Sequence, residues 1–199
     1  MSDITGTRVP VKLNSESELK DLMLSLNLDI NLYGSNKTKS MKELWLEYLN
    51  NESSLFVVNS SYLLRIIKVA VAKIRHPSGN GKLLREILQE WKDIGRVRSR
   101  DVFLSGKFDS NESYKECITR EILEELGSVL PANCKINVDE TSVTYAVENA
   151  QSSSYPGLQT EYHSYTAYVD VDGIPEIDEF QTTETTPSHG ILTATWQWR

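Results

Sequence analysis

The sequence is short of the residues that mark several large classes of protein. It contains two cysteines and three histidines among 199 residues. So few cysteines give no disulfide framework, and a reducing compartment is the simpler expectation. The histidines lie far apart in the chain and lack the spacing of zinc ligands. The sequence therefore predicts neither a disulfide-stabilised scaffold nor a zinc protein.

Positive charge and long apolar runs are also scarce. The formal net charge is −7, whereas a protein that binds the phosphate backbone of nucleic acids needs a basic surface. The opening residues, MSDITGTRVPVKLNSESEL, contain no apolar core of a signal peptide, and no run reaches the length of a membrane span. We therefore expect a cytoplasmic protein that binds neither membranes nor nucleic acids.

Length and composition favour one domain with an appended segment. Hydrophobic residues make up 39% of the chain, which is enough for a core. Two early segments, 15–28 and 40–50, carry apolar residues at helical spacing, and Ser15 precedes Glu18 at the distance of a capping box. We predict a helical extension over residues 1–54, which could mediate a homodimer, and the main domain over residues 55–199.

The main domain is predicted to be strands around one helix. Alternating and β-branched residues indicate strands on both sides of that helix, and this order favours a mixed α/β fold of the α+β type. The spacing in 82–91 also fits a helix, so that alternative stays open, and the acidic segment 172–186 is predicted to be a loop. The predicted strands are 55–58, 62–75, 82–91, 97–104, 135–138, 141–148, 160–171 and 190–198.

The most informative stretch runs from Gly106 to Gly127, GKFDSNESYKECITREILEELG. It predicts a helix, because an apolar residue recurs at every fourth position. Asp109 or Asn111 is expected to cap the start of this helix, and Gly127 to end it in the left-handed conformation. The recurring apolar residues are Tyr114, Ile118, Ile122 and Leu126.

Three glutamates of this helix share one face. Glu121, Glu124 and Glu125 stand at positions i, i+3 and i+4, where like charges destabilise a helix by about 0.2–0.5 kcal/mol per pair. A cation is expected to offset them, and Mg²⁺ fits because it takes carboxylate oxygens and binds substrate phosphates. The competing interpretation is an acidic helix face that is simply solvated.

The whole stretch resembles the Nudix box. Its pattern is Gly106, five residues, Glu112, seven residues, then Arg120-Glu121-Ile122-Leu123-Glu124-Glu125-Leu126-Gly127. Similarity to the Nudix hydrolases implies a mixed-sheet α/β/α sandwich in which 82–91 is a strand paired back on the preceding one. It also implies an enzyme that uses Mg²⁺ or Mn²⁺ to cleave a phosphoanhydride bond in a small molecule, either a nucleoside diphosphate derivative or a related organic pyrophosphate.

The resemblance implies a role for each charged residue of the box. Glu124 and Glu125 would be the principal metal ligands, and Glu121 a further ligand or the group that orients the attacking water. Arg120 would hold the glutamates through a bidentate pair, and Glu112 would brace the loop. The structural positions of the motif are Gly106, Glu112 and Gly127.

Positions around these residues leave several roles open. Ser105 stands where the family has a glycine whose backbone carbonyl can bind metal, and serine keeps the carbonyl but restricts the backbone. Ser128 occupies the closing aliphatic position. Lys107 could be structural or meet phosphate. Many family members use another acid after the box, and Glu161 is the first candidate for it here. The other candidates are Glu148, Asp178 and Glu179.

Two other functions stay open. A non-catalytic module on the same fold would bind a nucleotide or a partner; the departures at Ser105 and Ser128 favour it, and the intact glutamates argue against it. An enzyme that processes RNA 5′ ends is a lesser alternative, because the chain lacks a basic stripe. The sequence identifies neither the substrate-binding residues nor the group attached to the diphosphate.

Overall fold

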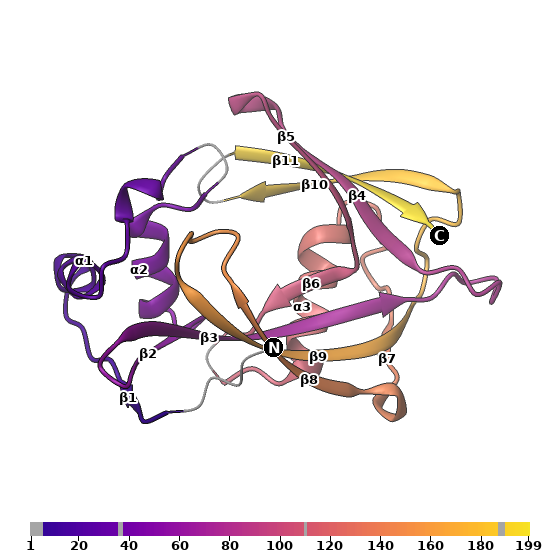
Figure 1. Ribbon diagram of the computed structural model, residues 1–199. Helices are drawn as coiled ribbons and strands as arrows, with labels where there is room; N and C mark the ends of the chain where they lie inside the picture. The colour runs from indigo at the N-terminus through magenta and orange to yellow at the C-terminus, as the bar shows by residue number, and fades with distance from the viewer. Residues whose placement is uncertain (1–5, 36–37, 110, 187–189) are drawn as a thin grey trace. The chain divides into compact units, whose positions relative to one another are not determined.

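The computed structural model describes residues 6–35, 38–109, 111–186 and 190–199 (Figure 1). Within these residues three α-helices combine with eleven strands, so the predicted mixed α/β class is confirmed. Contacts divide the chain into two compact units. The predicted division after residue 54 stays a prediction. Unit 1 comprises residues 1–69, 107–111 and 145–164, and unit 2 comprises residues 70–106, 112–144 and 165–199.

The two α-helices of unit 1 begin at serines that cap backbone N–H groups of the first turn. Ser15 accepts a hydrogen bond from the backbone N–H of Glu18, and Ser40 forms a complete capping box with Glu43. Such a cap contributes about 1 kcal/mol. Both predicted N-terminal helices are confirmed. The helices are α1 (Glu16–Ser25), the short 3-10 helix η1 (Ile30–Leu32) and α2 (Met41–Leu49).

The core of unit 1 forms between these helices and strands. Leu19 and Met23 of α1 and Leu44 of α2 are fully buried. They pack in one cluster with residues from strands and from the loop around Tyr155. Burying each such side chain stabilises the fold by about 1.5–3 kcal/mol. The remaining members of the cluster are Leu55, Leu63, Tyr155 and Leu158.

The larger sheet begins with three antiparallel strands of unit 1. Strands β1, β2 and β3 pair in sequence, with Val58 opposite both Arg8 and Tyr62. The sheet order is β1-β2-β3-β9-β7, with β6 pairing β3 and β8 pairing β9. The strands are β1 (Arg8–Pro10), β2 (Ser54–Val58), β3 (Tyr62–Ile74), β6 (Leu104–Lys107), β7 (Ile136–Val138), β8 (Thr144–Gln151) and β9 (Gln159–Val171).

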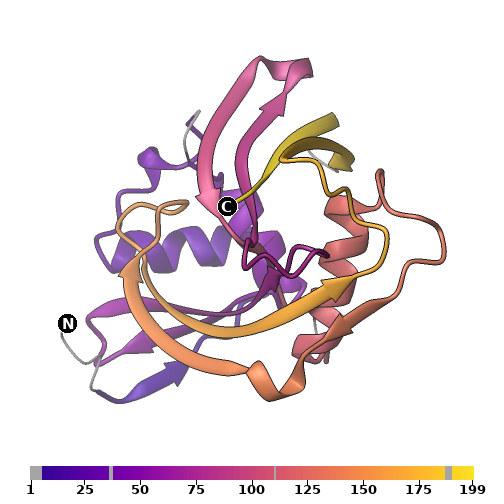
Figure 2. The ribbon, with the colours of Figure 1, turned by 90° about the vertical axis from the view of Figure 1, so that its right-hand side faces the viewer.

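Unit 2 holds a four-stranded antiparallel sheet and the helix α3 (Tyr114–Leu126), which packs on β10 (Figure 2). The indole N–H of Trp196 donates to the Thr182 hydroxyl at 2.8 Å, so this fully buried ring has its polar atom satisfied. The sheet order is β10-β11-β4-β5. The strands are β4 (Leu84–Trp91), β5 (Arg96–Val102), β10 (Glu179–Thr186) and β11 (Gly190–Trp198), and the 3-10 helices are η2 (Lys92–Ile94) and η3 (Glu140–Ser142).

The prediction of a loop over residues 172–186 is wrong, because its second half is strand β10. Phe180 and Thr182 alternate inward and are buried, and the strand pairs along its length with β11. The strand at 82–91 is confirmed as β4, but its predicted partner is wrong. It pairs with β11 and β5, and an isolated bridge between Arg75 and Leu83 joins the residues next to its start and to the end of β3.

Two other strand boundaries differ from prediction. The predicted strand 97–104 breaks at Phe103: β5 joins the smaller sheet, and β6 pairs with β3. The predicted strand 141–148 starts later and extends to Gln151, because the Asp139 carboxylate accepts hydrogen bonds from the backbone N–H and hydroxyl of Thr141 and holds a 3-10 turn there.

The two cysteines are free thiols, Cys117 buried and Cys134 partly exposed. Burial, together with the charges of Glu112 and Glu121, raises the pKa of the Cys117 thiol to about 12. Cys117 is therefore an inert core residue. Among the helices of the described residues, none is long and apolar enough to cross a membrane.

Candidate active site on helix α3

Helix α3 starts later than either predicted cap, Asp109 or Asn111, allows. Ser113 caps it: its hydroxyl accepts from the Glu116 backbone N–H at 3.3 Å, and the Glu116 carboxylate accepts from the Ser113 N–H at 2.8 Å. Asn111, one predicted cap, has a left-handed φ of 70° instead. The apolar face of the helix is confirmed, since Ile118, Ile122 and Leu126 are all buried.

The two glycines of the motif are required for different reasons. A Cβ on Gly106 would lie 1.8 Å from the Glu121 Cδ atom, so any side chain at this position would displace the Glu121 carboxylate. Gly127 ends the helix with a right-handed φ of −56°, which corrects the expected left-handed conformation. There a Cβ would lie 2.2 Å from the Leu123 carbonyl oxygen.

Arg120 connects the acids of the helix. Its Nε and Nη2 atoms donate to the two oxygens of Glu112 at 2.9 and 3.0 Å. Its Nη1 donates to Glu121 at 2.7 Å and to Glu124 at 3.2 Å. The hydrogen bonds to Glu112 raise the pKa of Arg120 above its ordinary value. Arg120 therefore sets the orientation of three carboxylates.

The three glutamates of the shared face differ in environment. The side chain of Glu124 is 55% exposed and that of Glu121 is 14% exposed. Burial raises the pKa of Glu121 in spite of the Arg120 contact. Burial also raises the pKa of Glu125 well above its ordinary value, and nearby Glu86 and Glu184 raise it further. Negative charge in this cluster is thus only partly compensated.

Glu86 and Glu184 belong to this cluster and were missed from the sequence. Glu86, on β4, is 3% exposed, and one of its oxygens accepts from Arg100 at 2.7 Å. Its other oxygen is buried and has no hydrogen-bond partner among the residues that the structure describes. Glu184 lies on β10, where burial and the charges of Glu121 and other acids raise its pKa to about 7. Glu86 follows the inward phase of its strand, which is a readable signal, whereas Glu184 fell in the segment predicted as a loop.

An open groove of about 600 Å³ runs along the outer face of α3. Its size is within the range of small-molecule sites. Arg120 and Glu124 belong to both the groove and the carboxylate cluster, and Leu123 supplies an exposed apolar surface. The other lining residues are Glu112, Lys115, Glu116 and Thr119.

The oxygen atoms of this cluster are suitable ligands for a hard divalent cation. All are carboxylates, the ligand type preferred by Mg²⁺ and Mn²⁺, and the unpartnered oxygen of Glu86 lies in the same cluster. Among the described residues, no three histidine, cysteine, aspartate or glutamate side chains are already arranged to hold an ion. Which of these glutamates would bind the cation is therefore a matter of proposal.

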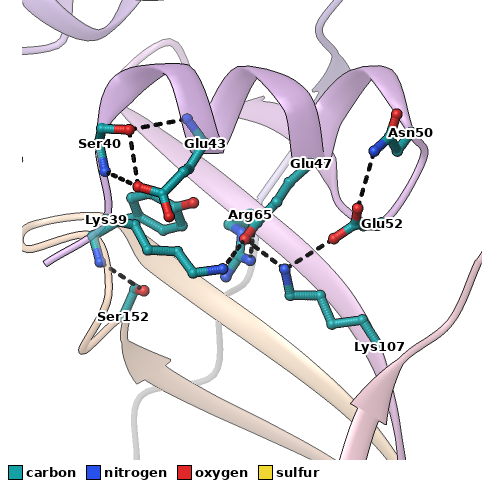
Figure 3. Close-up of polar contacts among 10 residues, drawn as sticks. Lys39, Ser40, Glu43, Glu47, Asn50, Glu52, Arg65, Lys107 and Ser152 are labelled. Atoms are coloured by element: carbon teal, nitrogen blue, oxygen red, sulfur yellow. Dashed lines mark hydrogen bonds and ion pairs between the residues drawn. The ribbon is translucent and has the colours of Figure 1, made fainter. Parts of the chain in front are cut away.

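Other residues suggested by the sequence have partners elsewhere. Glu161, in unit 1, is bound by Arg8 and His163. Lys107, also in unit 1, donates to Glu47 and Glu52 (Figure 3). Both contacts are with protein carboxylates, so Lys107 has a structural partner. Of the weaker candidates, Asp178 pairs with Lys82 at 2.8 Å.

The serines at the edges of the motif have separate environments. Ser105 lies in β6 beside Gly106, and the role of its carbonyl stays a prediction. Ser128 replaces the aliphatic residue with a hydroxyl that accepts from the backbone N–H of Thr183 on β10 at 3.0 Å. This substitution therefore ties the end of α3 to the strand that carries Glu184.

Comparison with known proteins gives one kind of match. No family model matches the chain, and no curated protein matches it. Among solved structures, 41 chains match. One is the crystal structure of an ADP compounds hydrolase, with 12% sequence identity, coverage of 73% of this chain and 68% of that chain, and a TM-score of 0.35. A likeness at this TM-score carries no functional weight, which leaves function to the chain's own residues.

Proposed function

We propose that the protein is a divalent-metal-dependent hydrolase of the Nudix type that cleaves a phosphoanhydride bond. The observation that carries this proposal is the group of carboxylates on three elements of unit 2, α3, β4 and β10. Arg120 and Arg100 compensate this group only in part. The substrate would be a nucleoside diphosphate derivative or a related organic pyrophosphate.

The cost of burying carboxylates favours a cation among the glutamates of α3, β4 and β10. Removing a carboxylate from water costs several kcal/mol unless it is paired, and the unpartnered oxygen of Glu86 shows that protein donors alone leave the group incomplete. When bound, Mg²⁺ or Mn²⁺ would neutralise phosphate charge and lower the pKa of a bound water. Glu124 and Glu125 would be its principal ligands, and Glu86 would support them.

The remaining residues would orient groups and move protons. Arg120 holds Glu121 and Glu124 in fixed positions, so Glu121 could act as a further ligand or orient the attacking water. Glu184 has a pKa of about 7, which suits a general base at neutral pH because part of it is ionised there. Glu184 thereby replaces Glu161 as our candidate for the acid outside the motif.

The groove beside Glu124 is the proposed place for the rest of the substrate. Leu123 offers it an apolar surface, and Lys115 offers a positive charge at the groove wall. Lys115 also pairs with Glu140 at 2.6 Å, so a phosphate would compete with that carboxylate. Substrate groups that combine an apolar ring with phosphate suit this lining.

The proposal is tested by turnover of a diphosphate panel that contains ADP-ribose, NADH, dinucleoside polyphosphates, sugar nucleotides and nucleoside triphosphates. Wild type should turn over at least one compound with Mg²⁺ or Mn²⁺ and none with a chelator. Glu124→Gln, which changes an exposed side chain, should lower the rate at least about 100-fold. The matched control is Glu176→Gln, an exposed acid in a loop of the same unit. Folded protein that turns over no compound would contradict the proposal.

A binding module without turnover is the second candidate. This candidate is favoured because, among the described residues, no set of side chains is already arranged to hold a metal ion. Such a module would be stabilised by a nucleotide, since any ligand that binds only the folded state raises the melting temperature. Stabilisation by a panel compound that is never hydrolysed would identify this second function.

A further inference from the structure

Unit 1 contains a hydrogen-bonded series of acid, imidazole and phenol that the proposed hydrolase does not use. His163 Nε2 lies 2.8 Å from a Glu161 oxygen, and the Tyr145 hydroxyl lies 2.6 Å from His163 Nδ1. Glu161 and His163 are two residues apart on β9, so their side chains point to the same face. Tyr145 lies on β8, which pairs with β9.

The hydrogen bonds define the proton positions in the neutral imidazole. Arg8 binds both oxygens of Glu161, at 3.1 and 2.8 Å, and these bonds lower the pKa of Glu161. An ionised carboxylate can only accept, so His163 Nε2 must carry the hydrogen. His163 Nδ1 is then the acceptor, and the Tyr145 hydroxyl donates to it. The phenol proton therefore points at a base.

Exposure is graded along the same series. The side chain of Glu161 is 7% exposed and that of His163 is 23% exposed, whereas Tyr145 is 53% exposed. The charged group that orients the base is thus covered, whereas the tyrosine at the other end of the series is exposed. A nucleophile, a base and an orienting acid in this order are the parts of an activated hydroxyl site.

We propose that Tyr145 is a nucleophilic phenol that accepts acyl groups from activated esters, with His163 as its base and Glu161 as the positioning residue. The Tyr145 oxygen attacks the ester carbonyl, and an oxygen–carbon bond forms. The phenol proton passes to His163 Nδ1. The bond to the leaving alcohol breaks, the alcohol oxygen takes the electron pair, and His163 returns the proton to it. The products are an acyl tyrosine and a free alcohol.

The competing account is a packing contact, since the Tyr145 and His163 rings lie 5.9 Å apart at 46°. Packing alone leaves the phenol with the reactivity of any accessible tyrosine. Activation makes it faster, because general base catalysis contributes roughly 10²–10⁴-fold. Tyr162 gives a comparison within the molecule: it is the neighbour of Glu161 on β9 and points to the other face. Because Tyr162 is partly buried, the His163→Gln variant below controls for the difference in exposure.

The test uses p-nitrophenyl acetate as the probe, with mass spectrometry of the peptides that contain Tyr145 and Tyr162. Tyr145 should be acetylated at least about 100-fold faster than Tyr162, and a chelator should not change its rate. Equal rates at the two tyrosines would overturn the proposal. Because both peptides come from one wild-type molecule, this comparison does not depend on the folding of any variant.

His163→Gln isolates the base. Glutamine can donate to Glu161 and accept from Tyr145, so it can keep both contacts, but it cannot take a proton. The acetylation rate of Tyr145 should fall to that of Tyr162, while Glu161→Gln should give a smaller fall and a shifted pH profile. An unchanged rate in folded His163→Gln would show that Tyr145 is not activated by His163.

Discussion

Two groups of charged side chains, one in each unit, differ in how far the protein compensates their charge. In unit 1, Glu47 is 4% exposed and meets Arg65, Lys39 and Lys107 (Figure 3). Burial raises the pKa of Glu47, but these cations outweigh burial and lower it to about 2. Every formal charge in this group has an opposite partner, so it works as a fixed link between α2, β3 and the segment that contains Lys107.

In the carboxylate cluster of unit 2, negative charge exceeds the positive charge that compensates it. Glu125 faces Glu86, Glu121 and Glu184, and the charge of Arg100 only partly offsets them, so its pKa is raised. A glutamate that the protein itself neutralises is structural, whereas glutamates that the protein leaves uncompensated are a functional-site candidate. The contrast between Glu47 and Glu125 therefore separates a link in the fold from a proposed ligand site.

The largest expected effect comes from Glu125→Gln. We expect turnover of the diphosphate substrate to fall at least about 100-fold. The same change should raise the stability of the metal-free protein, because it removes a partly buried carboxylate whose charge the neighbouring acids disfavour. Steady-state kinetics and urea unfolding of chelator-treated protein measure the two effects. A variant that is both active and less stable would break the comparison.

Glu47→Gln should show the reverse pattern. Removing one partner of a buried ion pair costs about 3–5 kcal/mol, since the remaining charges lose their compensation. Urea unfolding should show this loss in the free energy of unfolding, with Glu16→Gln on exposed α1 surface as the control. A loss equal to that of the control would show that the Glu47 group does not stabilise unit 1.

The two groups should respond to pH in opposite directions. Glu184 has a raised pKa of about 7, so its contribution to stability is present below about 4.5 and is lost as pH rises through about 7. Glu47 has a lowered pKa of about 2, so its contribution is present above about 4.5 and is lost as pH falls. The free energy of unfolding is measured between about pH 2 and pH 7 for chelator-treated wild type and for the variants Glu184→Gln and Glu47→Gln. The difference between wild type and each variant gives the contribution of that glutamate at each pH. A Glu184→Gln difference that does not vary between pH 4.5 and 7 would contradict the assignment.

The smallest expected effect is that of Lys39→Met. The Lys39 side chain is 41% exposed and lies 2.8 Å from Glu47, whereas Arg65 is buried at 3%. An exposed ion pair contributes only about 0–1 kcal/mol, so stability should change little. A loss as large as that of Glu47→Gln would show that Lys39, and not Arg65, provides the main compensation.

Local patterns predicted much of the structure. The spacing of apolar residues placed α3, α1 and α2, and alternation placed most strands, because these signals lie within a few neighbouring residues. The cap at Ser113 could also have been read, since Ser113 and Glu116 have capping-box spacing. The predicted caps are Asp109 and Asn111 instead, because both belong to residue types that often cap helices.

Long-range pairing was beyond the sequence alone. Strand β10 is rich in threonine and acid, and it becomes a strand because β11 pairs along it. That pairing brings Glu184 to α3, and the pairing of β4 with β11 brings Glu86 into the same sheet. The glutamates of the motif could thus be named in advance, but their neighbours from β4 and β10 could not.

The most direct measurement is Mn²⁺ binding to chelator-treated protein, followed by the loss of the electron paramagnetic resonance signal of free Mn²⁺. The account predicts that wild type and the exposed-acid control Glu176→Gln bind Mn²⁺ with similar affinity, and that Glu125→Gln binds at least about 10-fold more weakly. Equal affinity in wild type and folded Glu125→Gln, or no binding by wild type, would contradict the claim that the carboxylates of unit 2 form a cation site.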